Sequence, residues 1–188
     1  MSTIAFWKPY GVLTKFTDPE SRPTLADWIT EPDLYPAGRL DKDSEGLLVL
    51  SSDPRLRGKL TASRHPRTYL VQVEGDIGAA ALARLEAGVD VHGHRTAPAE
   101  ARLIDPPAWL GPRIPPIRVR RHIPDRWIEL TLREGRNRQV RKMTAAVGHP
   151  TLRLVRWSIG PITLDGLEAG EWRRLRRDEF DALQQALE

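Results

Sequence analysis

A polar loop that opens directly into an apolar stretch is the feature that most constrains how this chain can fold. Residues 38–46 are mostly charged or polar and carry a glycine at each end, and residues 47–50 follow as an unbroken apolar run. A short apolar run of this kind is typical of a buried strand. Loops positioned by a rigid scaffold often carry reactive groups. The sequence therefore predicts a charged loop held at the end of a buried strand.

Asp41 is the candidate reactive group in this loop. It lies between Arg39 and Lys42, and nearby positive charges favour the ionised form of a carboxylate. An ionised carboxylate can act as a nucleophile or as a general base. Asp41 could also form a salt bridge with its neighbours or cap the turn, and composition and spacing alone favour that structural role.

Five segments, in order along the chain, resemble the RsuA/RluE-type family of pseudouridine synthases. They are residues 8–12, 38–50, 69–71, 134–143 and 152–161. The resemblance covers most of the chain and is far more specific than any one segment. It implies an RNA pseudouridine synthase, an isomerase that flips a uridine out of folded RNA and converts it to pseudouridine with an essential aspartate. Asp41 matches that aspartate, but the sequence leaves open whether it attacks the ribose, adds to the base or acts as a base.

The resemblance also implies roles for residues outside the loop. Tyr69 would lie flat against the flipped uracil, and Leu154 would line the uracil pocket. Arg141 would pair with the catalytic Asp41 and orient it. Arg39 and Arg138 are further expected substrate-binding residues. From the sequence alone, Tyr69 could instead be a core aromatic residue, and the arginines of the fourth segment could form a solvated face.

Composition is consistent with one domain that spans residues 1–188. The chain has 188 residues, of which 40% are hydrophobic, enough for one core. Because it has no cysteine, disulfides and thiolate metal sites are excluded. No signal-peptide pattern and no apolar stretch of about 18 residues is present, so we expect a cytoplasmic protein without a membrane span. The net charge is +4, and its clustering suits a polyanionic partner.

Periodicity and turn residues predict an α+β fold. Strands are expected at residues 3–7, 47–51, 68–74, 97–104, 127–132 and 151–159, and helices at residues 54–60, 79–87, 137–147 and 178–187. Strands with interspersed helices and hairpin-length links favour a mixed sheet. The resemblance implies a single catalytic core with a curved, mostly antiparallel sheet, flanking helices and a central cleft.

Residues 105–124 form an insertion rich in proline and arginine. A stiff loop with arginines and Trp109 suits phosphate contact and base stacking, although a plain connecting hairpin is an equal alternative. The expected RNA contacts are Arg118, Arg120, Arg121 and Arg136. Because the first segment starts at residue 8, we expect no S4-type domain ahead of the core, and the insertion would then select the target. Residues 107–110, 115–118 and 136–141 are similar to one branch of the family's large-subunit synthases, which predicts 23S ribosomal RNA as the substrate.

The predicted reaction involves no redox change and no energy input, so we expect no cofactor. His92 and His94 lack the partner spacing of a metal site, and we expect none. The expected partner is 23S ribosomal RNA, free or in an assembly intermediate, with the protein as a monomer. Two other functions stay open. One is a non-catalytic RNA-binding or ribosome-assembly protein on the same fold. The other is a nucleoside glycosidase, which usually needs a second carboxylate such as Asp43 or Glu45.

Overall fold

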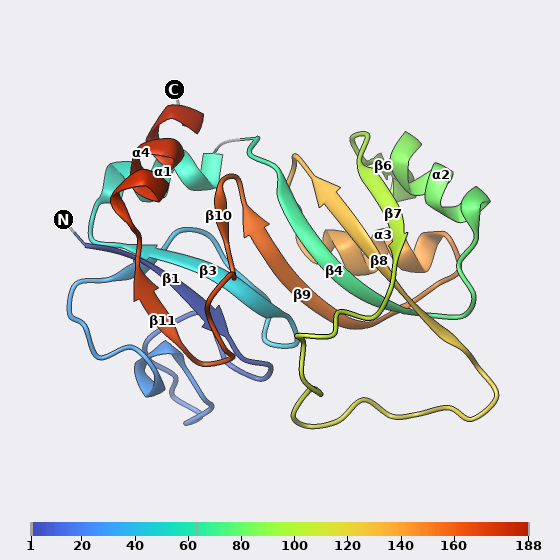
Figure 1. Cartoon of the computed structure of the whole chain (residues 1–188), viewed down its shortest axis with the longest axis horizontal. Helices are drawn as coiled ribbons and strands as arrows, with labels where there is room; N and C mark the ends of the chain where they lie inside the picture. The colour runs from blue at the N-terminus through green and yellow to red at the C-terminus, as the bar shows by residue number, and fades with distance from the viewer. Residues whose placement is uncertain (1, 63, 188) are drawn as a thin grey trace. The chain divides into compact units, whose positions relative to one another are not determined.

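Strands dominate the computed structural model, which describes residues 2–62 and 64–187 (Figure 1). The strands are β1 (Thr3–Lys8), β2 (Tyr35–Pro36), β3 (Glu45–Ser51), β4 (Arg67–Glu74), β5 (Asp90–Val91), β6 (His94–Arg95), β7 (Glu100–Ile104), β8 (Asp125–Leu132), β9 (Thr151–Ile159), β10 (Ile162–Thr163) and β11 (Trp172–Arg174). The helices are the 3-10 helix η1 (Leu25–Asp27) and the α-helices α1 (Pro54–Ala62), α2 (Ala79–Ala87), α3 (Gln139–Ala146) and α4 (Arg177–Ala186). The predicted α+β class with a mixed sheet is confirmed, and the sheet is open. None of the described helices is long and apolar enough to cross a membrane.

These elements divide into two units along the chain. The first unit comprises Met1–His65 and Arg156–Glu188, and the second comprises Pro66–Val155. The strand order is β11-β1-β3-β9 in the first unit and β9-β4-β8-β7 in the second. Strand β9 contributes to both, because the boundary falls after Val155. That residues 1–188 act as one catalytic domain stays a prediction.

The core of the second unit follows from the alternation of side chains along β4. Tyr69, Val71 and Val73 point to one face, where they join a buried cluster. The cluster also includes Ile128 and Leu130 of β8, Val140 and Met143 of α3, Val147 directly after α3, and Leu85 of α2. Helix α2 therefore presents Leu85, and α3 a stripe of apolar residues, to the same face of the sheet.

The core of the first unit contains residues of β1 and β3 and of the loops next to these strands. Ile4 and Phe6 of β1 pack with Leu48 and Leu50 of β3, to which β1 pairs antiparallel. Leu40, which directly precedes Asp41, belongs to the same buried cluster. Full burial of a leucine side chain stabilises a fold by roughly 1.5–3 kcal/mol. Leu40 therefore fastens the Asp41 loop to the core.

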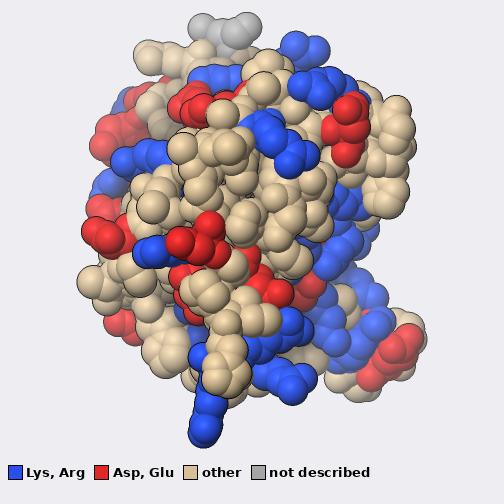
Figure 2. Space-filling model, turned by 90° about the vertical axis from the view of Figure 1, so that its right-hand side faces the viewer, with Lys and Arg blue, Asp and Glu red and all other residues tan. Residues whose placement is uncertain are grey.

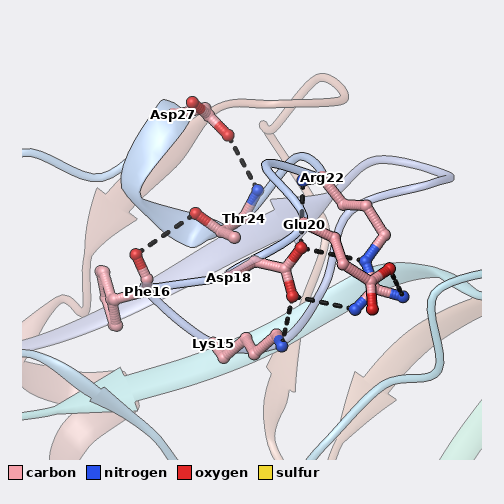
Figure 3. Close-up of polar contacts among 7 residues, drawn as sticks. All are labelled: Lys15, Phe16, Asp18, Glu20, Arg22, Thr24 and Asp27. Carbon is pink, nitrogen blue, oxygen red and sulfur yellow. Dashed lines mark hydrogen bonds and ion pairs between the residues drawn. The ribbon is translucent and has the colours of Figure 1, made fainter.

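A single carboxylate organises the loop between β1 and η1 (Figure 3). The Asp18 side chain is 1% exposed. It accepts hydrogen bonds from Arg22 Nε and Nη2, both at 2.9 Å, and from Lys15 Nζ at 2.6 Å. These bonds, those from Arg22 first, hold the pKa of the Asp18 carboxyl well below its usual range. The segment that follows the Lys8-Pro9 dipeptide is therefore an ordered loop.

Candidate active site

Asp41 lies half-buried in the loop that precedes β3. Residues on both sides of it are buried: Leu40 in the core cluster, Ser44 directly before β3, and Glu45 as the first residue of β3. The backbone N–H of Ser44 donates to the carbonyl oxygen of Asp41 at 3.0 Å, which closes a turn. The predicted location of Asp41, in a charged loop held at the end of a buried strand, is confirmed.

Segment 11–14 holds the backbone around Asp41. The hydroxyl of Thr14 donates to the Leu40 carbonyl oxygen at 2.6 Å and accepts from the Leu40 N–H at 3.3 Å. The N–H of Gly11 donates to the Lys42 carbonyl oxygen at 2.8 Å. The first and second sequence segments therefore meet through Gly11, and Thr14, which follows the first segment, holds the backbone on the other side of Asp41. Sequence reasoning missed Thr14, because its contact with Leu40 is not local.

Lys8 is a fully buried lysine beside this loop. Its ammonium donates to the carbonyl oxygens of Pro9 and Val12, each at 2.8 Å. Burial lowers the pKa of Lys8 from its ordinary value of 10.5 to about 7. The carboxylates of Glu45, Asp43 and Asp41 oppose that shift in pKa by attraction. Lys8 thus ties segment 9–12 together at the place where these acidic side chains gather.

This burial predicts how stability depends on pH. Between the folded pKa of Lys8 near 7 and the unfolded pKa near 10.4, the unfolded chain binds more protons than the folded one. The free energy of unfolding therefore receives a contribution from Lys8 that rises with pH across this window, by at most about 1.4 kcal/mol per pH unit. Below the folded pKa both states are protonated, and the contribution is constant.

Denaturant unfolding of the wild type and of Lys8→Met at pH 7, 8 and 9 measures this contribution. The difference in unfolding free energy, wild type minus variant, should rise by about 2 kcal/mol from pH 7 to pH 9. Lys59→Met, the same change at an exposed position of α1, is the matched control for the substitution itself. A flat difference for Lys8→Met would show that Lys8 stays protonated in the folded state.

Gly46 allows β3 to start close against β9. It has a φ of 108°, and a Cβ at this position would overlap the carbonyl oxygen of Arg156. The guanidinium of Arg156, itself buried, donates from Nε to the Leu47 carbonyl oxygen at 2.8 Å. The second glycine of the loop is therefore required by a close approach of two backbones.

In the second unit, the structure brings Tyr69 and Leu154 together. Tyr69 is 8% exposed and Leu154 is 5% exposed, and both belong to the cluster that α3 covers. Val140 of α3 lies in the same cluster. Tyr69 is thus packed in the core of this unit, as expected for a core aromatic residue, and its role as a surface for the base stays a prediction.

Arg138 and Arg141 lie at the start of α3. Arg138 is the exposed N-cap residue, with a left-handed φ of 52°, and Arg141 is half-buried in the first turn. Buried Gln139 fixes this turn: its Nε2 donates to Glu134 Oε1 at 2.6 Å, and its Oε1 accepts from the Arg136 N–H at 2.9 Å. Sequence reasoning missed Gln139 as a positioning residue, although it lies inside the fourth segment.

The predicted site residues thus divide between the two units. Arg39, which is exposed, and Asp41 lie in the first unit, and Tyr69, Arg138, Arg141 and Leu154 lie in the second. Within residues 2–62 and 64–187, no group of three or more His, Cys, Asp or Glu side chains could hold a metal ion.

Comparison with known proteins identifies the family. The family described as RNA pseudouridylate synthase matches residues 2–146, a range that includes Asp41, Tyr69 and Arg141. The chain belongs to this family. The predicted enzyme class, an RNA pseudouridine synthase, is confirmed, and the family membership does not favour the non-catalytic alternative.

Individual relatives of the family agree along most of the chain. The chain is 56% identical over 164 residues to a ribosomal large subunit pseudouridine synthase E of Xanthomonas axonopodis pv. citri, covering 85% of this chain and 86% of that protein. It is 50% identical over 175 residues to the protein of the same name from Vibrio parahaemolyticus, covering 92% and 73%. A crystal structure of a pseudouridylate synthase superimposes with a TM-score of 0.81 at 30% identity, covering 97% of this chain and 73% of that one.

Proposed function

We propose that this chain converts a specific uridine of 23S ribosomal RNA into pseudouridine and that Asp41 is the essential catalytic residue. The similarity to large-subunit pseudouridine synthases over most of their length supports the substrate. The observation that carries the proposal for Asp41 is the loop itself, held by Leu40 in the core and by Thr14 and Gly11 at the backbone. Such support positions a reactive group within a narrow range.

The reaction rearranges one glycosidic bond. The bond between N1 and C1′ breaks, a bond between C5 and C1′ forms, C5 loses a proton and N1 gains one. Atoms and electrons balance within the nucleotide, so the reaction consumes no co-substrate. We propose that the site contributes a carboxylate, a surface for the base and positive charge for the backbone. We assign the carboxylate to Asp41 and the surface to Tyr69 and Leu154. Binding and orientation are assigned to Arg39, Arg138 and Arg141.

We propose that the insertion between β7 and β8 contacts RNA. It forms a long excursion from the edge of the second unit (Figure 1). Arg118 and Arg121 are exposed, and Lys and Arg side chains gather at the lower edge of the face in Figure 2, toward which the insertion extends.

The insertion also exposes large apolar side chains that could contact bases. Trp109, Ile114 and Val119 are 50%, 84% and 85% exposed. Arg120 forms an ion pair with Glu74 at 3.1 Å, so we expect a smaller contribution from Arg120 than from its neighbours.

Salt dependence of binding tests these contacts. Each phosphate contact contributes about 0.7 to the slope of log affinity against log salt for a single strand. The double variant Arg118→Gln, Arg121→Gln should therefore lower the slope by about 1.4. Exposed arginines outside the insertion, Arg84 and Arg95, give the matched control when both are changed to glutamine, and the slope should then stay at the wild-type value. An unchanged slope for the insertion variant would make the insertion a plain connector.

The proposed activity can be tested with purified protein and a transcript of 23S ribosomal RNA. We expect one uridine to become pseudouridine and no free uracil to appear. Release of free uracil would instead support the nucleoside glycosidase. RNA binding without either product would support the non-catalytic assembly protein.

We further propose that residues 1–188 act as one catalytic domain, as a monomer in the cytoplasm. The rate of pseudouridine formation on free 23S RNA, compared with the rate on isolated precursor particles, shows which of the two is the substrate. Sedimentation at the concentration of the assay reports the oligomeric state. A dimer at that concentration would contradict the monomer.

A further inference from the structure

The second unit has a hollow beneath the insertion. Its volume is about 200 Å3, and it is lined by Gln72 and Glu74 of β4, by Leu152 of β9 and by insertion residues between Ile117 and Pro124. None of the residues assigned above to the uridine lines this space. The hollow is therefore a separate feature of the molecule.

The hollow lies on the face of β4 that the core does not use. Tyr69, Val71 and Val73 point into the core cluster, so alternation directs Gln72 and Glu74 to the opposite face. The insertion covers these two residues. Gln72 and Glu74 therefore form the polar floor of the hollow, and the insertion residues between Ile117 and Pro124 form its roof.

Contacts at several points hold the roof of the hollow in place. Arg153 of β9, which is 7% exposed, donates from Nη1 to the Gly111 carbonyl oxygen at 2.7 Å and so holds the part of the insertion that precedes the lining residues. The N–H of Gly75 donates to the Pro124 carbonyl oxygen at 2.7 Å. The ion pair between Arg120 and Glu74 joins the roof to the floor. The hollow is therefore formed in advance, and a ligand would not have to order the loop.

The chemistry of the lining suits a nucleobase. The amide of Gln72, which lies in the lining, offers one acceptor and two donors. Val119 and Ile123 expose apolar surface, 85% and 41% respectively. Arg118 and Arg121 belong to the same lining. Unpaired bases are read by polar contacts to their edges and by stacking on apolar or guanidinium surfaces, whereas a small anion would need no apolar surface.

We propose that this hollow binds an unpaired nucleobase of the RNA substrate, at a nucleotide other than the one that is modified. The proposal rests on the proposed function for the identity of the RNA. That the hollow binds a base is argued from the polar side chain of Gln72, from the exposed apolar residues of the insertion and from the contact of Arg153 that holds the insertion.

Binding of hexanucleotides tests the hollow without any catalytic turnover. The probes are labelled single-stranded RNA hexamers of A, C, G or U and a hexamer of the same backbone with abasic sites, added to the full chain. We expect at least one base-containing hexamer to bind about tenfold or more tightly than the abasic one, because base stacking and edge contacts are lost. No preference for bases in the wild type would contradict the proposal.

Variants then locate the preference in the hollow. Gln72→Ala combined with Val119→Ala should reduce the ratio of base to abasic affinity at least fivefold, and Arg153→Met should act in the same direction by releasing the roof. Gln184→Ala, the same change at an exposed position of α4, should leave the ratio unchanged. An unchanged ratio in the Gln72 and Val119 variant would overturn the assignment even if Arg153→Met fails to fold.

A 23S fragment that carries single abasic sites separates this inference from the proposed function. In the wild type, one unpaired position other than the target should lower the affinity about tenfold, and the same position should have little effect in the Gln72 and Val119 variant. Absence of pseudouridine with the wild type would defeat the proposed function and leave the hexamer result standing. If the wild type forms pseudouridine but no abasic position other than the target lowers the affinity, the proposal for the hollow is wrong and the proposed function stands.

Discussion

Asp41→Asn should abolish pseudouridine formation and leave the fold intact. Asparagine has nearly the same shape, so Leu40 stays in the core and the backbone contacts of Thr14 and Gly11 remain. Only the carboxylate is lost. We expect turnover on a 23S fragment to fall by more than about 100-fold, with RNA affinity within about twofold and a melting temperature within about 4 °C of the wild type.

Asp43→Asn is the matched control, because it makes the same chemical change two residues away in the same loop. It should retain most of the turnover. Equal loss from both variants, together with free uracil as the product, would favour a hydrolysis that uses two carboxylates. Asp41→Asn with nearly normal turnover would show that Asp41 is not the catalytic residue, and a large fall in melting temperature would point to a structural role.

Arg141→Met should reduce turnover by about 10- to 100-fold, because a charged hydrogen bond contributes about 1.5–3 kcal/mol. Arg141→Lys should lose less but should not match the wild type, since an ammonium cannot reproduce the planar fork of a guanidinium. Steady-state kinetics on the same 23S fragment measure both variants. Arg133→Met, at an exposed position before α3, is the control and should change turnover little.

The combination of Asp41→Asn with Arg141→Met tests whether both residues serve one step. Asp41 and Arg141 belong to different units of the chain, so kinetics must test whether the effects of the two substitutions depend on each other. Residues that act together are not additive, and the double variant should be no slower than Asp41→Asn alone. Normal turnover of Arg141→Met would rule out the role assigned to Arg141.

Local patterns predicted most of the regular structure, and they failed where contacts from other segments decided the outcome. Helix α2 and strand β9 have the predicted bounds, because their periodicity and end signals are local. Strand β7 begins at Glu100, three residues later than predicted, since the N–H groups of Ala97 and Ala99 bond to Glu134 and Glu86. Helix α3 begins later than predicted because Arg138 is left-handed.

The candidate site shows the same division. The position of Asp41 before a buried strand was visible in the sequence, because charge and hydrophobicity change sharply there. The contacts of Thr14 with Leu40, of Gln139 with Glu134 and of Arg120 with Glu74 were not. Each depends on where the chain returns in space or on side-chain geometry, and neither composition nor periodicity reports it. Strands of two or three residues, such as β5 and β11, were too short to show a period.

We propose above that Asp41 of this chain makes pseudouridine in 23S ribosomal RNA. The most direct test of this proposal is a map of pseudouridine in ribosomal RNA from cells that lack the protein, complemented with the wild type or with Asp41→Asn at equal levels. One 23S position should lose pseudouridine in the deletion strain, regain it with the wild type and remain uridine with Asp41→Asn. A map that is unchanged by the deletion, or a position restored by Asp41→Asn, would contradict the claim.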